Sequence, residues 1–294
     1  MKENSENSTT TSANTNLSSN SKNSCTKLKL QQQISSGLTS ELFLALNELN
    51  EKVVVKIFNN ESEHNFLNEK NYIEKSSTFN NIIQVYAYGK ITTPYDKYCN
   101  HYYIVMEYAE KGDLVSLIEE KGNFSENEAK KIFLQLLSAV QTIHQNGFVH
   151  RDIKPENFLI CKDQIKLTDF GFCEEIMNCS RDKNGTPGYI PPEILERDEI
   201  IIPEAIDVFS LGVVAFILVL GEFPFENPSR DDPCYTFISE EKWDKYWQSV
   251  NCEFVSKEFK DIFQAMVAEQ PEKRPTIEEI KMCDWLKEVM IDNI

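Results

Sequence analysis

The hydrophobic pattern of this chain changes near Gly112, and the change limits the folds that the chain can adopt. Before Gly112, short runs rich in β-branched residues and bounded by polar residues predict strands at 28–30, 52–58, 82–89 and 102–108. An amphipathic pattern among these strands predicts one helix over 60–75. After Gly112, apolar residues at helical spacing predict helices over 125–146, 207–220 and 256–268, and a last helix that opens at Thr276. A strand-rich part followed by a helix-rich part predicts an α+β fold.

The polar residues at the start of the second predicted helix match the signature of a capping box. Ser125 precedes the helix and Glu128 follows three residues later. In this arrangement each side chain accepts a hydrogen bond from the other residue's backbone N–H, which fixes the helix start at Ser125.

The length and the composition of the ends suggest how the chain is divided. The 294 residues are enough for one large domain or for two lobes, but 17 of the first 24 are Asn, Ser or Thr. Such a segment buries too little apolar surface to offset the entropy lost on ordering. We therefore expect a disordered tail over 1–26 and a folded domain over 27–292, with a small lobe at about 27–106 and a larger one at about 107–292.

Charge and residue usage disfavour several classes of protein. With 30 Lys and Arg against 47 Asp and Glu, the net charge of −17 disfavours binding to nucleic acid or to anionic membranes. The longest apolar run, 211–220, is too short to span a membrane and is typical of a buried helix. Eight Cys without a Cys-x-x-Cys pair predict reduced thiols, and four His without metal spacing predict no zinc site. With no apolar secretory segment near residue 1, we expect an intracellular location, cytoplasmic or nuclear.

The strongest chemical signal is the segment His150-Arg151-Asp152-Ile153-Lys154-Pro155-Glu156-Asn157. Asp169-Phe170-Gly171 follows, and Asp169 lies seventeen residues after Asp152. These two motifs at this interval are highly specific. On these residues the chain resembles the eukaryotic protein kinases, and the resemblance covers about 31–292. It implies the two-lobed kinase fold, with a small β-rich lobe that contains one key helix and a larger helical lobe.

The resemblance assigns roles in phosphoryl transfer, which needs charge neutralisation on the transferred group and a positioned hydroxyl. It implies that Asp152 accepts or orients the proton of the substrate hydroxyl and that Lys154 neutralises the γ-phosphate. Asn157 and Asp169 are oxygen ligands suited to Mg²⁺. Lys154 also resembles the Ser/Thr branch of the family rather than the Tyr branch. ATP, Mg²⁺ and protein substrates follow from the resemblance.

The same resemblance places the ATP-binding residues. It implies that Lys56, at the end of a β-branched strand, contacts the α- and β-phosphates and pairs with Glu69 on the first helix. Other positions surround the nucleotide: Met106 at the back pocket, Glu107 and Ala109 on the linker that binds adenine, Asp113 at the ribose, and Leu42, Val54 and Leu159 around the purine ring. The resemblance also places Ile73, Val85, His150 and Phe170 in an apolar stack.

The loop that covers the phosphates departs from the family pattern. The family favours three glycines in a G-x-G-x-x-G loop, whereas Ser35-Ser36-Gly37-Leu38-Thr39-Ser40 keeps the middle glycine, Gly37, with Ser at the other two positions. Serine offers a backbone N–H but restricts positive φ and close approach to the phosphates. A catalytically weak nucleotide-binding scaffold is therefore an alternative to an active kinase. A small-molecule kinase of similar fold is disfavoured by the full activation segment.

The activation segment resembles that of the family from Asp169 to Glu193. By resemblance, Thr186 lies near Asp152 and Lys154, Glu193 pairs with Arg274, and Asp207 caps the backbone of the catalytic loop. The usual phosphoacceptor position falls on Asp182, whose charge of about −1 is smaller than the −1.5 to −2 of a phosphate. The sequence leaves three interpretations open. Asp182 supplies that charge to Arg151, Asp182 is unpaired, or Ser180 is the phosphoacceptor.

The sequence defines the kinase group, the substrate preference and the partners less closely than it defines the catalytic residues. Gly185-Thr186-Pro187-Gly188-Tyr189-Ile190-Pro191-Pro192-Glu193 most resembles the calcium/calmodulin-dependent kinase group, although no calcium loop is present in the sequence. Glu156 and Asp113 match acidic positions that select a basic residue upstream of the acceptor, whereas a third such position is Ile217. Residues 107–294 carry 20 basic and 37 acidic side chains, a field that favours basic peptides. We expect a monomer or a transient association, with no nucleic acid and no membrane span.

Overall fold

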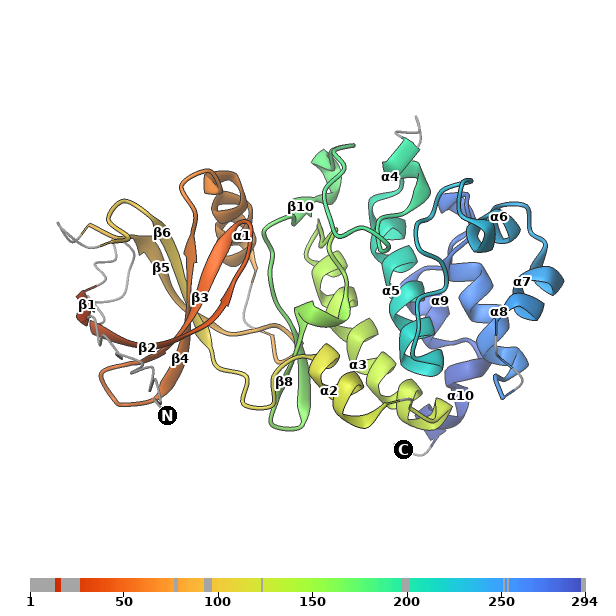
Figure 1. Ribbon diagram of the computed structural model, residues 1–294, viewed down its shortest axis with the longest axis horizontal. Coiled ribbons are helices and arrows are strands. Elements are labelled where there is room, and N and C mark those ends of the chain that lie inside the picture. Colours follow the sequence, from red (N-terminus) through yellow and green to blue (C-terminus); the bar gives the residue numbers. More distant parts are fainter. Residues whose placement is uncertain are drawn as a thin grey trace, which may run out of the picture. The chain divides into compact units, whose positions relative to one another are not determined.

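The computed structural model describes residues 14–16, 27–76, 79–92, 97–122, 124–196, 201–250, 252 and 254–291. The chain forms two compact units, of which unit 1 comprises 1–67 and 84–108 and unit 2 comprises 68–83 and 109–294. Most of the tail predicted to be disordered (1–13 and 17–26) and residue 292 lie outside the described residues. Unit 1 is built on a sheet and unit 2 mainly on helices (Figure 1), so the predicted α+β fold, with a strand-rich part before a helix-rich part, is confirmed.

The sheet of unit 1 is antiparallel, with the strands in the order β1-β2-β3-β4-β6-β5. Its strands are β1 (Asn14–Asn16), β2 (Lys27–Ser36), β3 (Ser40–Leu46), β4 (Lys52–Phe58), β5 (Val85–Lys90) and β6 (Tyr102–Glu107). Val53, Val55 and Ile57 alternate along β4 and pack with Phe43 and Tyr103 in the core of the unit. Residues two apart on a strand share a face, so this alternation explains how the short β-branched run covers the core.

The strand β1 (Asn14–Asn16) lies inside the segment for which composition predicts a disordered tail. Thr15 is paired with Leu28 at the edge of the sheet. An edge strand presents unpaired backbone N–H and C=O groups, which any sequence can pair with through its own backbone. Side-chain composition therefore does not exclude this contact.

The helix α1 (Glu63–Lys75) starts three residues later than predicted, with an acidic first turn and Lys75 in its last turn. These charges complement the helix dipole. In unit 1, the ring of Phe66 stacks on Tyr102 at 4.4 Å between centroids and lies edge-on to Phe58 at 5.5 Å. The second half of α1 belongs to unit 2.

Unit 2 is organised around a long buried helix, α3 (Glu126–Gln145). Its other helices are α2 (Leu114–Lys121), α4 (Pro192–Glu196), α5 (Pro203–Leu220), α6 (Pro233–Ser239), α7 (Trp243–Ser249), α8 (Lys257–Met266), α9 (Ile277–Lys281) and α10 (Asp284–Ile291). The helix α3 contacts α5, α9 and α10, and the predicted capping box of Ser125 and Glu128 is present at its start. It is therefore the scaffold against which the rest of the unit packs.

Two short ladders hold the loops of unit 2. The strand β7 (Phe148–Val149) pairs with β10 (Glu174–Glu175), and β8 (Phe158–Cys161) pairs with β9 (Gln164–Leu167). The residues that follow β7 are those of the motif from His150 to Asn157, and β10 follows Gly171. The ladders thus bring the two sequence motifs into one part of unit 2.

The helix α5 is apolar enough and long enough to cross a membrane by those two criteria alone. In the structure every residue from Ala205 to Leu220 is buried, as the sequence predicts for a core helix. Gly212 lies where α5 and α8 approach closely, because a Cβ there would lie 2.9 Å from Val267 Cγ1 and 3.0 Å from Met266 Cβ. The absence of a side chain at Gly212 therefore sets the distance between these helices.

Candidate functional site

The backbone of the loop after β7 is held by one buried carboxylate. Asp207, on α5, accepts hydrogen bonds from the backbone N–H groups of His150 and Arg151, each at 2.8 Å. It also lies 2.8 Å from His144 Nε2. Burial opposes ionisation of this carboxyl, but its hydrogen bond with His144 and the backbone bonds lower the pKa of Asp207. An ionised Asp207 therefore fixes the loop, as the resemblance implied.

This support matters because the loop adopts an unusual backbone conformation. Arg151 has a φ of 69°, in the left-handed region that a long side chain seldom occupies. Strained residues of this kind persist only where the surrounding structure over-determines them. The two bonds to Asp207 supply that constraint directly beside Asp152.

The carboxylate of Asp152 lies at the centre of a polar cluster. Lys154 Nζ is 3.1 Å from Asp152 Oδ2, and Asn157 Nδ2 donates to the same oxygen at 3.1 Å and to the Asp152 backbone carbonyl at 2.7 Å. Thr186 Oγ1 donates to Asp152 Oδ1 and accepts from Lys154, both at 2.7 Å. Asp152 is buried, so these donors hold its carboxylate in a fixed orientation.

The side chains proposed to bind metal carry suitable oxygen donors. The amide nitrogen of Asn157 donates to Asp152, which directs the amide oxygen of Asn157 elsewhere as a potential ligand. Asp169 has a φ of 64°, and its Oδ1 lies 3.4 Å from the backbone nitrogen of Gly171. One carboxylate and one amide oxygen suit Mg²⁺, which usually keeps waters and substrate phosphates as further ligands. Within the described residues, no group of three or more His, Cys, Asp and Glu side chains gathers as a metal site.

Phe170 packs on the half of α1 that belongs to unit 2. Its ring stacks on Tyr72 at 4.0 Å between centroids and lies edge-on to His150 at 5.3 Å. The resemblance placed Ile73 in this stack, and the structure adds the buried ring of Tyr72 beside Phe170. Asn68 donates to the carbonyl of Gly171 at 3.1 Å, which adds a polar contact between α1 and the same motif.

The far end of the activation segment is anchored in the core of unit 2. Glu193 and Arg274 form a two-fold ion pair with both distances at 2.7 Å, and both side chains are fully buried. Ser210 on α5 donates to the carbonyl of Tyr189 at 2.8 Å. The contact expected between Glu193 and Arg274 is therefore present, and it fixes the segment that follows Thr186.

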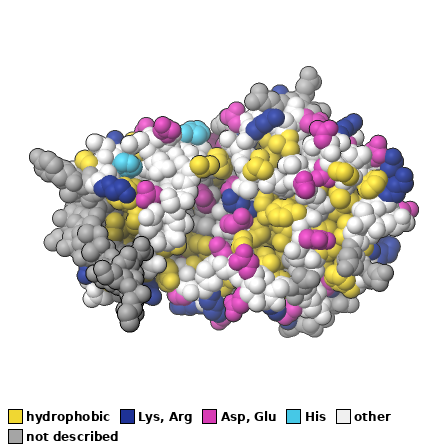
Figure 2. Space-filling view, viewed as in Figure 1, with side chains coloured by type: hydrophobic (Ala, Val, Ile, Leu, Met, Phe, Trp, Pro, Cys, Tyr) yellow, Lys and Arg dark blue, Asp and Glu magenta, His cyan; other side chains and the backbone are white. Residues whose placement is uncertain are grey.

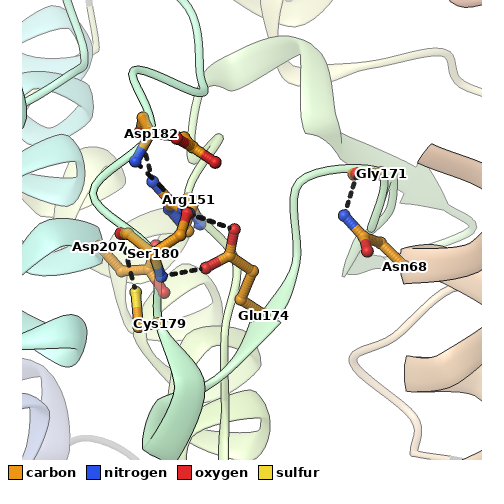
Figure 3. A network of polar contacts seen from close by, with 8 residues as sticks. All are labelled: Asn68, Arg151, Gly171, Glu174, Cys179, Ser180, Asp182 and Asp207. Atoms are coloured by element: carbon orange, nitrogen blue, oxygen red, sulfur yellow. Dashed lines mark hydrogen bonds and ion pairs between the residues drawn. The ribbon is translucent and has the colours of Figure 1, made fainter. Parts of the chain in front are cut away.

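The partner of Arg151 differs from the one considered in the sequence. The acidic side chain that Arg151 contacts is Glu174 on β10, whereas Asp182 offers its backbone carbonyl, at 2.6 Å from Arg151 Nη2 (Figure 3). Ser180 lies between them, with its Oγ 2.8 Å from Arg151 Nη1. Burial raises the pKa of the neighbouring Cys179 to about 12, so its thiol stays neutral.

The remaining candidate residues divide between the two units. Unit 1 carries Gly37, Leu42, Val54, Lys56, Met106 and Glu107, and unit 2 carries Glu69, Ala109, Asp113, Glu156 and Leu159. Lys56 and Glu69 are both buried, and each belongs to a different unit. Asp113 is paired with Leu159 in an isolated bridge, and its Oδ1 accepts from Ser116 as the N-cap of α2. Glu156 is exposed.

The serine-substituted loop forms an ordinary hairpin between β2 and β3. Gly37 donates to the carbonyl of Ser40 at 2.9 Å, and a Cβ on Gly37 would meet nothing closer than 3.6 Å. Neither Ser35 nor Ser40 is among the described residues with positive φ. The hairpin conformation therefore does not require glycine at the two positions where this chain has serine.

Acidic side chains are spread over unit 2 rather than gathered at one point. On the face shown in Figure 2 they lie singly or in small groups among basic and uncharged side chains. The excess of acidic residues in 107–294 therefore acts as a diffuse field on that face.

Sequence reasoning missed Glu174, Glu175 and Tyr72 as parts of this site. Glu174 lies 23 residues from Arg151 along the chain, and the ladder between β7 and β10 places it there. A pair of acidic residues shortly after Gly171 is the signal that was available. It carries meaning only once the pairing of β10 with β7 is known.

Comparisons with known proteins agree with this geometry. Residues 28–286 match the protein kinase domain family. Serine/threonine-protein kinase SIK2 of Gallus gallus is 36% identical over 188 residues, which are 63% of this chain and 23% of the relative. The SNF-related serine/threonine-protein kinase of Homo sapiens is 36% identical over 192 residues, 64% of this chain and 24% of the relative. Serine/threonine protein kinase OSK3 of Oryza sativa is 33% identical over 246 residues, 80% of this chain and 45% of the relative. The chain thus spans less than half the length of these relatives.

Proposed function

This chain belongs to the protein kinase domain family, and on that premise we propose that it transfers the γ-phosphate of ATP to Ser and Thr hydroxyls of proteins. The relatives named above are serine/threonine kinases by name, and one of them is an SNF-related kinase. The observation that carries the proposal is the oriented carboxylate of Asp152, held by Lys154, Asn157 and Thr186.

The chemistry that we assign to these residues is positioning and proton acceptance. Asp152 orients the substrate hydroxyl and accepts its proton as the oxygen attacks the γ-phosphorus. The ammonium group of Lys154 stabilises negative charge on the transferred phosphoryl group. Thr186 fixes the positions of the Asp152 and Lys154 side chains, because it hydrogen-bonds to both.

We assign Mg²⁺ binding to Asn157 and Asp169, whose oxygen donors fit a hard cation. The bound ion neutralises charge on the phosphates. We assign the ATP phosphates to Lys56 with Glu69 as its partner, and the nucleotide to the positions named from the resemblance. The kinase domain corresponds in this proposal to 27–292, with lobes at about 27–106 and 107–292, in a protein that acts inside the cell.

The substrate preference that we propose is a basic residue upstream of the acceptor. Glu156 is exposed on the loop that carries Asp152, and this exposure supports contact with a peptide. Ile217, at the third position where related kinases use an acid, is buried in α5. The preference therefore rests on Glu156 and Asp113, as well as on the acidic field of unit 2.

The alternative is a nucleotide-binding scaffold that transfers no phosphate. The reason to consider it is serine at two of the three glycine positions. It would require a hairpin that cannot hold the phosphates of ATP in a position for transfer. The hairpin between β2 and β3 forms without positive φ at Ser35 or Ser40, which weakens that motive. We therefore favour the active kinase.

The test is transfer of labelled phosphate to a peptide library in the presence of Mg²⁺. We expect Asp152→Asn to lower kcat by about 100-fold or more, because proton acceptance and orientation typically contribute about 10²–10⁴. Asp169→Ala is the contamination control, since signal that survives this change comes from another kinase. ATP binding to the wild-type chain without transfer to any peptide contradicts the proposal and supports the scaffold.

A further inference from the structure

The carboxylate of Glu174 occupies the middle of a network around Arg151 (Figure 3). One oxygen, Oε1, accepts from Arg151 Nη1 and from Ser180 Oγ, the latter at 2.9 Å. The other, Oε2, accepts from the Ser180 backbone nitrogen at 2.5 Å. Arg151 completes the network through Ser180 Oγ and the carbonyl of Asp182. Three donors therefore converge on one side chain.

The pair of Arg151 and Glu174 is shielded from water. The exposed fraction is 1% for the side chain of Arg151 and 15% for that of Glu174. Exposed ion pairs contribute little, whereas removing one partner of a buried pair leaves an uncompensated charge. The loss of Glu174 therefore affects Arg151 directly, and Arg151 directly precedes Asp152.

The neighbouring residue extends the network to the helix α1. Glu175 forms an ion pair with Lys75 and accepts from Asn71 at 3.4 Å. These hydrogen bonds, with Lys75 the larger contributor, lower the pKa of Glu175. The ladder with β7 places Glu174 opposite Val149 and Glu175 opposite Phe148. Two adjacent carboxylates thus join the loop of Asp152 and the second half of α1 to the activation segment.

We propose that Glu174 is a positioning residue for phosphoryl transfer, whose carboxylate binds Arg151 in the unmodified chain and makes phosphorylation of the activation segment unnecessary. The inference rests on the proposed kinase activity. It replaces the earlier hypothesis about Asp182, because Asp182 gives Arg151 a backbone carbonyl. A carbonyl carries no net charge, whereas the carboxylate of Glu174 forms an ion pair.

The network also determines the effect of phosphate on Ser180. The Ser180 hydroxyl lies 2.9 Å from Glu174 Oε1, so a phosphate there would bring a charge of about −1.5 to −2 beside the carboxylate. The two anions would repel each other and compete for Arg151. Phosphorylation of Ser180 is therefore inhibitory or neutral in the wild-type chain, and it becomes useful only when Glu174 is neutralised.

The experiment compares phosphatase-treated full chains in steady-state phosphoryl transfer to one peptide. We expect Glu174→Gln to lower kcat by about 10- to 100-fold, with KM for ATP changed less than about twofold, because a charged hydrogen bond to Arg151 is lost while the residues assigned to ATP are unchanged. Glu174→Asp keeps the charge and recovers part of the loss. Glu258→Gln is the matched control at an exposed position on α8 and leaves kcat unchanged.

A double variant separates charge from packing. Ser180→Glu in the wild-type background gives no activation, whereas Ser180→Glu added to Glu174→Gln raises kcat, since it returns an anion to Arg151. Three results overturn the inference: wild-type activity that requires phosphorylation, full activity in Glu174→Gln, or a loss confined to Asp182→Asn. A merely structural role for Glu174 would not give rescue by an anion at a different residue.

A second readout does not depend on catalysis. Arg181 and Lys183 are exposed on the activation segment, so trypsin reports how firmly the segment is held. We expect faster cleavage at these residues in Glu174→Gln than in the Glu258→Gln control. If the wild-type chain transfers no phosphate, the proposed function fails. Faster cleavage of Glu174→Gln would still support the contact between Glu174 and Arg151. Unchanged cleavage in Glu174→Gln would contradict the claim that the pair of Glu174 and Arg151 holds the activation segment.

Discussion

At the scale of single residues, the fixed points of the site are buried charges that each satisfy several donors. Asp207 accepts from two backbone N–H groups and bonds with His144, and it is completely buried. Loss of one such acceptor leaves several donors without a partner. The left-handed backbone of Arg151 would then lose its constraint, and Asp152 would lose its position along with it.

We predict that Asp207→Asn lowers the free energy of unfolding by about 2–3 kcal/mol at neutral pH. The pKa of Asp207 is lower in the folded state than its ordinary value of 3.8. Its contribution is therefore present above about pH 3.8 and is lost as the pH falls through the folded-state pKa. Urea unfolding at neutral and acidic pH tests this, and the difference between wild type and variant should shrink in acid.

The control for this prediction is Asp163→Asn. Asp163 is 96% exposed and pairs with the exposed side chain of Lys111, so we expect a change within about 0.5 kcal/mol. A difference between wild type and Asp207→Asn that grows as the pH falls would contradict the stabilising role of the ionised carboxylate.

At the scale of elements, the contact between α5 and α8 depends on a residue without a side chain. Alanine has a better helix propensity than glycine by about 1 kcal/mol, which alone would make Gly212→Ala stabilising. The added Cβ would lie 2.9 Å from Val267 and 3.0 Å from Met266, closer than packed carbons lie. Overpacking of a filled core costs about 1–3 kcal/mol, so the steric effect outweighs propensity.

We therefore predict that Gly212→Ala lowers the unfolding midpoint in urea. Gly37→Ala is the matched control for stability, because a Cβ at Gly37 meets nothing closer than 3.6 Å. We expect the control to leave the midpoint within error of the wild type. A higher midpoint for Gly212→Ala would mean that the two helices separate at little cost.

Elements with a simple periodicity could be predicted from the sequence, and others could not. The helix α3 was predicted to within a residue because its apolar stripe and capping box agree. The strand β3 was not predicted because its run from Leu42 to Leu46 is apolar throughout and lacks the alternation with polar residues that marks a half-buried strand. The helix α5 starts at Pro203, four residues before the predicted start, because proline is favoured at the first helical position and the apolar pattern alone does not reveal it.

The same distinction applies to the candidate site. Asp152, Asn157 and Lys154 lie within six residues, so one motif identifies them, and the structure brings them together. Glu174 contacts Arg151 through the pairing of β7 and β10, which no local pattern reveals. Contacts made by tertiary pairing of two-residue strands are therefore the part that the sequence could not provide.

At the scale of the whole molecule, the excess of acidic residues in 107–294 predicts long-range attraction of basic peptides. We expect kcat/KM for an arginine-containing peptide to fall several-fold when the salt concentration rises from about 50 mM to about 500 mM, because ions screen the field. A peptide with neutral residues in place of arginine is the control and should respond weakly. Equal salt responses of the two peptides would mean that the surface charge serves solubility alone.

The burial of α5 has a consequence for the order in which the chain is made. Residues 203–220 leave the ribosome before residues 257–266, so α5 emerges while the helix α8 that packs on it does not yet exist. Until then its apolar surface is shielded on the sides that earlier elements such as α3 can reach. Exposed apolar segments of this kind promote aggregation during synthesis. The nascent chain should therefore be most vulnerable, and most in need of a chaperone, between the emergence of residue 220 from the ribosome and the emergence of residue 266.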